Sequence, residues 1–381
     1  MRVLQLGKYY EPYVGGIETH LALLAHGLQA RGVEVEVLVH GNGTRTVREN
    51  VRGIPVTRVG ALLRALSTEL APSLVGELSR SYEVLHLHAP HPMAMVAYLL
   101  ARKPPHALVI THHSDIVRQV RLKGLLSPVF GAVHSRAAAI IATSQRYLDT
   151  SREIGEFRPK VRVIPYGSDL HQFSPLLKDS RPAHELRSKC GERVVLATGR
   201  LIYYKGFEVL LDAMRTVRGH LLLIGDGPLR GALEDRARRN GIRERVTFVG
   251  AVPNDRMGPY YGAADVFVLP SIARSEAFGI VQIEALACGI PVVNTALASG
   301  VPDVSIHDVT GLTVPPNDAE ALALAISRVL DDPALAARLS SKARQRALER
   351  FTADRMVEET LAVYRRVARS GTAQEAQARL G

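Results

Sequence analysis

Short apolar runs that alternate with longer amphipathic stretches constrain this chain more than any other feature of its sequence. Ile17–Arg31 has helical spacing, and Gly32 is placed to end that helix. Because strands buried on both faces are continuous apolar runs, the alternation predicts a parallel sheet with helices on both sides. In the first half, the runs expected to form strands are Val3–Gly7, Glu34–Val39, Ile54–Val59, Val84–His88, Ala107–His112 and Ala138–Thr143.

The same pattern restarts after the polar, proline-punctuated stretch Pro165–Gly191. The fold class is therefore α/β, with two doubly wound Rossmann-like domains, 1–168 and 169–354. We expect a C-terminal helix, at about 355–375, to pack back on the first domain. Two such domains place a ligand cleft between the carboxyl ends of their strands. The expected strands of the second domain are Arg193–Gly199, Leu221–Gly225, Val246–Gly250, Val266–Ser271 and Pro291–Thr295.

The charge and composition narrow the class of partner and the compartment. The formal net charge is +11, and residues 1–168 hold 20 Lys and Arg against 12 Asp and Glu, which favours anionic partners. Nucleic acid is disfavoured because the chain has no Trp and no nucleic-acid-binding motif. No apolar run approaches the roughly 20 residues of a membrane-spanning helix, and the start of the chain lacks a signal peptide. With only Cys190 and Cys288, we expect a cytoplasmic protein.

The segment Ser275–Val293 carries the most specific signal for a site. Glu276 stands at a strand-to-helix turn with seven residues between it and Glu284. Phe278, Gly279 and Ile280 would then offer backbone N–H groups at a helix N-terminus, which suits a phosphate. Glu284 would lie about two turns further on, within reach of a ribose diol. The alternative is an amphipathic helix with two solvated glutamates.

Two cations follow the first strand of the second half. Arg200 and Lys205 lie in the loop after Arg193–Gly199, where they could neutralise a diphosphate leaving group. The chain contains no Asp-x-Asp triplet, so we expect no catalytic metal and no required cofactor. Surface charge on a loop is the alternative interpretation.

Glycine turns mark two further candidate positions. Gly15 and Gly16 precede a predicted helix and could present N–H groups to a phosphate, although they do not form a dinucleotide-binding fingerprint. Asp226 lies in a turn after Leu221–Gly225 and could face a nucleotide. A plain turn is the alternative in both places.

Histidines gather at two strand ends of the first half. His112 and His113 follow one strand, and a histidine there could contact a substrate or simply be a bonded polar group. His86, His88 and His91 have metal-like spacing, but no acidic or cysteine ligand accompanies them. We therefore predict no metal site there and place His88 and His91 on an acceptor side.

A basic amphipathic stretch, Val117–Val133, follows these histidines. Arg118, Arg121 and Lys123 accompany several leucines, a pattern that fits either an anionic membrane surface or a core-facing helix with a solvated side. Peripheral contact with the inner face of the cell membrane is one prediction from this pattern.

Together these strings resemble glycosyltransferase family 4, a retaining family of GT-B architecture, over nearly the whole chain. Ser275–Val293 is similar to the family's E-x7-E signature. The resemblance implies that Glu276 binds hydroxyls of the donor sugar and that Glu284 binds the nucleotide ribose. It also implies that Arg200 and Lys205 occupy the positions of the family's two cations.

In the first domain, the resemblance assigns roles to a glycine pair and a histidine. Gly15 and Gly16 would touch the diphosphate, with an acidic residue such as Glu18 nearby, on the acceptor side with His88 and His91. His113, rather than His112, would contact the transferred sugar.

The strings THHSDIV and SIARSEAFGIVQIEALACG look most like transferases that build bacterial surface polysaccharide. This resemblance favours GDP-mannose over a UDP-sugar as donor, and a glycan or lipid-linked acceptor. Rival hypotheses are a GT-B-fold sugar-nucleotide epimerase, a phosphorylase and a non-catalytic nucleotide-sugar-binding protein. The sequence does not indicate an oligomeric state.

Overall fold

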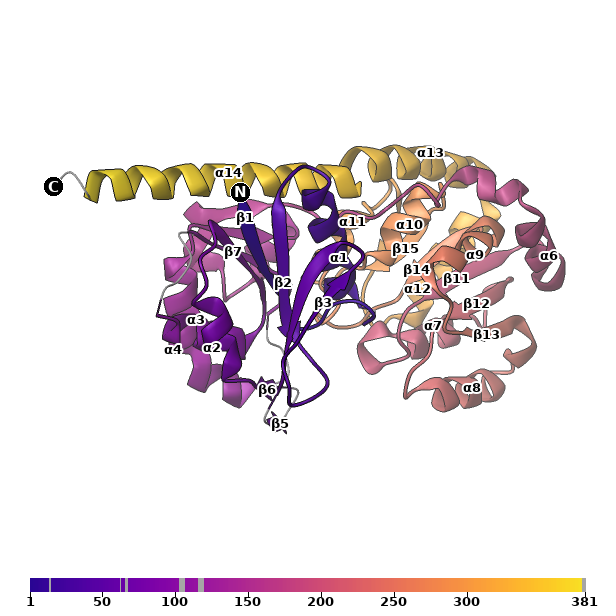
Figure 1. Ribbon diagram of the computed structural model, residues 1–381. Coiled ribbons are helices and arrows are strands. Elements are labelled where there is room, and N and C mark those ends of the chain that lie inside the picture. Colours follow the sequence, from indigo (N-terminus) through magenta and orange to yellow (C-terminus); the bar gives the residue numbers. More distant parts are fainter. Residues whose placement is uncertain (14, 62, 66–67, 103–106, 116–119, 379–381) are drawn as a thin grey trace. The chain divides into compact units, whose positions relative to one another are not determined.

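The computed structural model describes residues 1–13, 15–61, 63–65, 68–102, 107–115 and 120–378. The chain forms two compact units (Figure 1). Unit 1 comprises Met1–Gly167 and Ala353–Gly381, and unit 2 comprises Ser168–Thr352. Each unit is built around its own mainly parallel sheet.

The sheet of unit 1 has eight strands in the order β10-β9-β8-β7-β1-β2-β4-β3. Neighbouring strands are parallel except at one edge, where β3 runs antiparallel to β4. The strands are β1 (Arg2–Leu6), β2 (Glu34–His40), β3 (Val47–Val51), β4 (Ile54–Val59), β7 (Val84–Ala89), β8 (Ala107–His112), β9 (Ala139–Ala142) and β10 (Val161–Val163), and β5 (Leu63–Ala65) with β6 (Thr68–Leu70) forms a separate two-stranded sheet.

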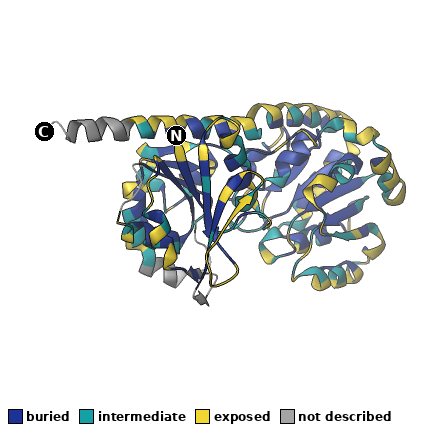
Figure 2. Ribbon diagram, in the orientation of Figure 1, coloured by how far each residue is buried: buried dark blue, intermediate teal, exposed yellow. Residues whose placement is uncertain are grey.

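Successive side chains of each strand point to opposite faces of the sheet, so the core of unit 1 has two layers. Val3 packs with helices α1 (Gly16–Gln29) and α14 (Ala353–Ala378), whereas Leu4 and Leu6 pack on the other face. Figure 2 shows the buried strands between partly exposed helices. The helices that cover the other face are α2 (Ser73–Leu78), α3 (Pro92–Leu100) and α4 (Val120–Arg136), and α5 (Gln145–Thr150) with the 3-10 helix η1 (Gly155–Lys160) completes the unit.

The sheet of unit 2 has six strands in the order β13-β12-β11-β14-β15-β16. Every neighbouring pair is parallel, as the buried apolar runs predict. The predicted α/β class with two Rossmann-like sheets is confirmed. The strands are β11 (Val194–Thr198), β12 (His220–Ile224), β13 (Val246–Gly250), β14 (Val266–Leu269), β15 (Val292–Thr295) and β16 (Gly311–Val314).

Helices cover both faces of this second sheet. Apolar side chains of α7, α8 and α12 pack in one buried cluster with the strands, while α9 and α10 contact the sheet elsewhere. No described helix combines the length and the apolar character that a bilayer crossing requires. The helices are α6 (Arg181–Cys190), α7 (Phe207–Ala213), α8 (Arg230–Arg239), α9 (Gly258–Ala263), α10 (Val281–Ala287), α11 (Val301–Val304), α12 (Ala319–Asp331) and α13 (Pro333–Arg350), with 3-10 helices η2 (Pro175–Asp179), η3 (Tyr203–Lys205), η4 (Arg243–Arg245) and η5 (Asn254–Arg256).

Candidate active site

Two loops of unit 2 meet at the carboxyl ends of the adjacent strands β11 and β14. The Ile272 N–H donates to the Tyr204 carbonyl at 2.8 Å, which ties the two loops together. Gly206 has φ +67°, and a Cβ at this position would overlap the Pro270 carbonyl. Glycine is required there both by the backbone conformation and by the close approach of the second loop. The contact brings residues about 70 positions apart in sequence side by side.

An ion pair between Lys205 and Glu276 joins these loops. Lys205 Nζ lies 2.6 Å from Glu276 Oε2, and Ser271 Oγ donates to the same oxygen at 3.0 Å. The two charged side chains are 12% and 10% exposed. Such a shielded pair is strongly coupled, because little water screens it. The structure therefore places two predicted site residues in direct contact, and Lys205 holds a carboxylate of its own chain.

Arg200 lies at the same strand end and is exposed. Burial raises the pKa of Tyr204, while the positive charges of Lys205 and Arg200 oppose that rise. Both cations therefore lie close enough to the Tyr204 hydroxyl to influence its charge. Lys205 Nζ is 5.9 Å from the centre of the Tyr204 ring. Within the described parts of the chain Arg200 forms no ion pair, and Lys205 rather than Arg200 pairs with Glu276. Its guanidinium is thus available to a bound anion.

Helix α10 begins later than the sequence suggests, and this corrects the place of Glu284. Phe278, Gly279 and Ile280 precede the helix, which starts at Val281, so Glu284 lies in its first turn instead of two turns along. The cause is Gly279, whose φ of +74° cannot continue a helix. A Cβ there would come within 2.5 Å of Leu269 Cδ2. A phosphate-binding role for the N–H groups of residues 278–280 stays a prediction.

Glu284 is buried and bonded to a tyrosine. The Tyr261 hydroxyl donates to Glu284 Oε2 at 2.6 Å. Burial raises the pKa of Glu284 to about 7, and the Tyr261 hydrogen bond partly opposes the rise. The pKa of Tyr261 is raised well above its ordinary value, first by burial and then by Glu284, so its hydroxyl remains a donor. The solvated-glutamate alternative is therefore wrong for both Glu276 and Glu284.

The two predicted glycine turns are present with local partners. Asp226 is exposed and accepts a hydrogen bond from the Gly227 N–H at 2.7 Å, as in a plain turn. Gly15 caps helix α1, which begins at Gly16, and a Cβ at Gly15 would overlap the Glu18 carboxylate. Glu18 thus occupies part of the helix start that was expected to receive a phosphate. Diphosphate contacts at these residues stay predictions.

His113 is part of a buried hydrogen-bonded chain in unit 1. Its Nε2 lies 2.9 Å from His88 Nδ1, and its Nδ1 bonds to the Tyr166 hydroxyl. His88 Nε2 lies 2.9 Å from Gln5 Oε1, and Gln5 Nε2 donates to Tyr364 of α14 at 2.9 Å. These polar groups share a sheet face because the strand positions alternate.

The Gln5 amide determines which ring nitrogens of His88 and His113 carry a proton. Its carbonyl oxygen can only accept, so His88 Nε2 donates and His88 Nδ1 accepts from His113 Nε2. His113 Nδ1 then accepts from the Tyr166 hydroxyl. Burial, followed by neighbouring imidazoles, lowers the pKa of His113 well below its ordinary value, so its ring is neutral. Contact of His113 with a sugar stays a prediction.

The other histidines have separate roles. His91 Nδ1 accepts from the Ala94 N–H at 3.3 Å and so caps α3, and its ring packs against His40. His112 bonds to Tyr147 at 2.6 Å and to Glu153 at 3.1 Å. An acceptor-side role for His88 and His91 stays a prediction.

The structure describes the basic stretch Val117–Val133 only in part. Helix α4 begins at Val120, inside the predicted amphipathic segment. Arg118 lies outside the described residues, and so do the side chains of Arg121 and Lys123. Membrane contact stays a prediction.

Several site residues escaped the sequence analysis. Ser271 ends the predicted strand run Val266–Ser271, and a hydroxyl at a strand end is itself a signal of a site. Tyr261, Tyr166 and Tyr364 supply hydroxyls from distant segments, and no local pattern identifies them. The position of His20, on α1 beside His88 and His113, was missed for the same reason.

Comparison with protein families matches both halves of the chain. Residues 182–346 match the family described as "Glycosyl transferases group 1", and residues 14–172 match "Glycosyltransferase Family 4". A D-rhamnosyltransferase of Pseudomonas aeruginosa, WbpZ, is 33% identical over 93% of both chains. An O-antigen chain mannosyltransferase C of Escherichia coli is 29% identical over 96% of this chain and 98% of its own.

Solved structures show the same architecture. Sucrose-phosphate synthase of Thermosynechococcus elongatus has a TM-score of 0.79 and 26% identity, over 97% of this chain and 99% of its own. HepE of Anabaena, in complex with UDP and glucose, has a TM-score of 0.74 and 23% identity, over 95% of this chain and 98% of its own.

This chain belongs to glycosyltransferase family 4 and has the GT-B fold. It is an enzyme that transfers a sugar from a nucleotide-sugar donor to an acceptor.

Proposed function

We propose that this enzyme transfers mannose, with retention, from GDP-mannose to a hydroxyl of a glycan or lipid-linked acceptor. The acceptor would belong to the synthesis of a bacterial cell-surface polysaccharide. The observation that carries the assignment of the donor site is the contact of Lys205 with Glu276 beside the exposed Arg200. The relatives named as O-antigen mannosyltransferase and D-rhamnosyltransferase support the sugar and the pathway class.

The two cations would bind the diphosphate of the donor. Arg200 offers a planar fork of donors, and Lys205 offers a compact charge that Glu276 holds in place. The sugar hydroxyls bind Glu276, and the ribose diol binds the ionised form of Glu284. His113 contacts the transferred sugar.

In the transfer step, the bond from the anomeric carbon to the phosphate oxygen breaks as the bond to the acceptor oxygen forms. Charge builds on the leaving diphosphate, and Arg200 and Lys205 stabilise it. The anomeric centre becomes oxocarbenium-like. The acceptor attacks from the face that the phosphate leaves, and its proton passes to the leaving phosphate oxygen. No resident metal or cofactor is needed for this sequence of steps.

A UDP-sugar-dependent transferase is the second candidate, supported by the structural likeness to HepE with bound UDP and glucose. Thermal shifts with GDP-mannose, other GDP-sugars, UDP-sugars and ADP-sugars separate these donors. A ligand at 100 times its dissociation constant stabilises by about 2.7 kcal/mol. We expect the largest shift from GDP-mannose, and a larger shift from a UDP-sugar would overturn the proposed donor.

Transfer itself distinguishes the remaining rivals. Release of GDP with formation of an α-linked product is expected when a suitable acceptor is added. Sugar interconversion without acceptor would instead identify an epimerase. Binding without transfer or donor hydrolysis would identify a non-catalytic protein.

A further inference from the structure

His20 is an unusual buried side chain because its ring nitrogens have no hydrogen-bond partner. It is 6% exposed, and neither Nδ1 nor Nε2 is hydrogen-bonded within the described structure. Its ring packs edge-on against His88 and His113, with centroids 5.6 and 5.2 Å away. Buried polar atoms are normally bonded, so the two ring nitrogens of His20 leave hydrogen-bonding or metal-binding capacity unused.

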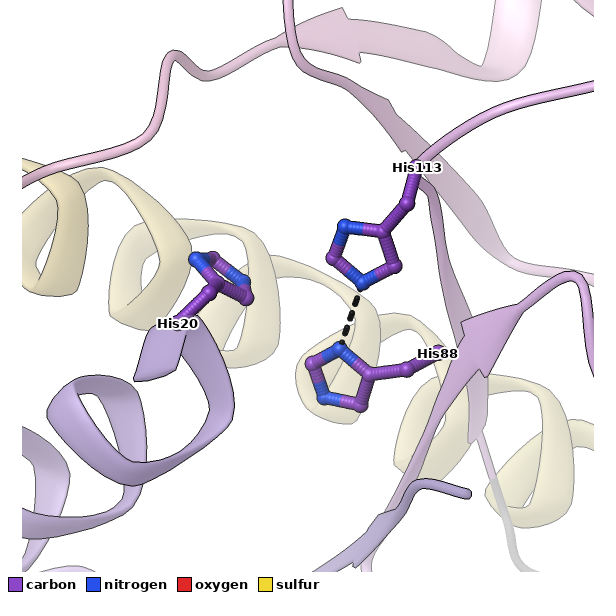
Figure 3. Close-up of side chains that lie close together, drawn as sticks. All are labelled: His20, His88 and His113. Carbon is purple, nitrogen blue, oxygen red and sulfur yellow. Dashed lines mark hydrogen bonds between the residues drawn. The ribbon is translucent and has the colours of Figure 1, made fainter. Parts of the chain in front are cut away.

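His88 of strand β7 and His113, which directly follows β8, lie beside His20, and the Tyr166 ring packs edge-on against it with the centroids 4.9 Å apart. Figure 3 shows His20 on helix α1, beside the bonded pair of His88 and His113. One nitrogen from each of the three rings lies within 4.8 Å of the others. This trio differs from the group His86, His88 and His91 suggested by sequence spacing.

We propose that His20, His88 and His113 form a binding site for one zinc ion or a similar transition-metal dication. Zinc bonds to histidine nitrogen at about 2.0–2.1 Å, so tetrahedral ligands lie about 3.4 Å apart. The His88–His113 pair, now at 2.9 Å, opens slightly, and the His20 nitrogen, within 4.8 Å of the others, approaches by at most about 1.4 Å. A water or substrate oxygen would fill the fourth position.

Moving one proton prepares the ligands. If the His113 proton moves from Nε2 to Nδ1, Nδ1 donates to the Tyr166 oxygen and the Tyr166 proton turns away. His113 Nε2 and His88 Nδ1 then both present lone pairs. His88 keeps its Nε2 bond to Gln5 Oε1. His88 and His113 thus each keep a hydrogen bond on the other nitrogen, which is the arrangement that orients histidines on metals, whereas His20 has no such bond in the described structure.

The electrostatics favour neutral ligands. Burial disfavours the charged form of an imidazole, and all three rings are buried. The neutral imidazole is the form that binds a metal ion.

A second group of side chains that could bind a metal, which includes two carboxylates, provides the matched control. One ligand atom each of His112, Asp115 and Glu153 also lies within 4.8 Å of the others. These groups are already bonded, since His112 bonds to Tyr147 and Glu153, and Asp115 accepts from Ser151 at 2.6 Å. We therefore expect the zinc to prefer the trio with the unbonded His20.

The consequence for transfer rests on the proposed function. An ion on His113 would withdraw this ring from the donor sugar, so zinc would inhibit the transferase rather than serve as its cofactor. Binding of the ion does not depend on that consequence, so the two are tested separately.

The experiment titrates the metal-free full chain with Zn²⁺ and Co²⁺. We expect one ion per chain, visible bands of four-coordinate cobalt, and at least about a 100-fold weaker zinc affinity in His20→Gln. His20→Leu is the second variant, because the His20 nitrogens have no partner to lose. Glu153→Gln should bind zinc like the unmodified protein. Circular dichroism checks that each variant is folded.

Two results would overturn the site: equal zinc binding by the folded His20 variants, or loss of binding in Glu153→Gln. If zinc binds and His20→Gln abolishes it while no nucleotide sugar is turned over, the metal site stands and the proposed function fails. If the enzyme transfers sugar in the presence of a chelator, and zinc inhibits only the protein that retains His20, the proposed function and the metal site are both supported.

Discussion

Replacing the two cations of the donor site separately should give different effects on stability and turnover. Arg200→Ala removes an exposed side chain with no ion pair in the described structure, so unfolding free energy should change by less than about 0.5 kcal/mol. Turnover should nevertheless fall about 10²–10³-fold, since a group that stabilises developing negative charge is worth about 3–4 kcal/mol in the transition state.

Lys205→Ala should reduce both the unfolding free energy and the turnover. It leaves the Glu276 carboxylate, in a side chain only 10% exposed, with the Ser271 hydroxyl but without its counter-charge. Breaking a buried pair costs about 3–5 kcal/mol, and the remaining exposure favours the lower value. At about 2–4 °C per kcal/mol for a unit of this size, the melting temperature should fall by roughly 6–12 °C.

The double variant Lys205→Ala/Glu276→Gln is the control for this reasoning. It removes the unpaired charge, so part of the lost stability should return while turnover stays low. Melting temperatures from calorimetry and kcat from nucleotide release measure both effects. Turnover of Arg200→Ala within threefold of the unmodified enzyme, or a Lys205→Ala protein as stable as the unmodified one, would refute the assignment.

Further predictions concern other parts of the site. The pKa of Glu284 is 4.5 in the unfolded chain and about 7 in the folded protein. Folding therefore favours the protonated carboxyl, and this stabilisation is complete below about pH 4.5. As the pH rises from 4.5 to 7, the unfolding free energy should fall by about 3 kcal/mol. Because the ribose needs the carboxylate, donor affinity should weaken below pH 7, and calorimetry of Glu284→Gln should show no such dependence. Gly279→Ala should lower the unfolding free energy by at least about 1 kcal/mol in denaturant titrations, because of its φ of +74° and the Leu269 contact; an unchanged value would contradict the strain. Arg121→Glu/Lys123→Glu should weaken sedimentation with anionic vesicles, and equal sedimentation would exclude this stretch as a membrane contact.

The sequence was most informative for the strands of the two main sheets. Ile54–Val59 and Val246–Gly250 were predicted with the bounds that β4 and β13 have, although β13 is buried only at Val246 and β4 mixes apolar and polar positions. The edge strand β3 (Val47–Val51) was missed, since four of its five residues are exposed and its pattern is polar. Strand β16 (Gly311–Val314) was also missed, since Gly311 and Thr313 interrupt its apolar pattern, whereas β14 has the same length and is entirely apolar.

The site could be predicted only as separate local motifs. The E-x7-E segment and the Arg200–Lys205 loop follow from sequence, but their ion pair depends on Gly206 admitting the Pro270 carbonyl. The helix start at Val281 depends on the backbone conformation of Gly279. Hydroxyl partners such as Tyr364, which is 359 residues from Gln5, require the folded chain.

A structure of the protein with GDP-mannose tests the central claim most directly. We expect the diphosphate on Arg200 and Lys205, the mannose hydroxyls on Glu276 and the ribose diol on Glu284. A bound donor with none of these four side chains within hydrogen-bonding distance would contradict it.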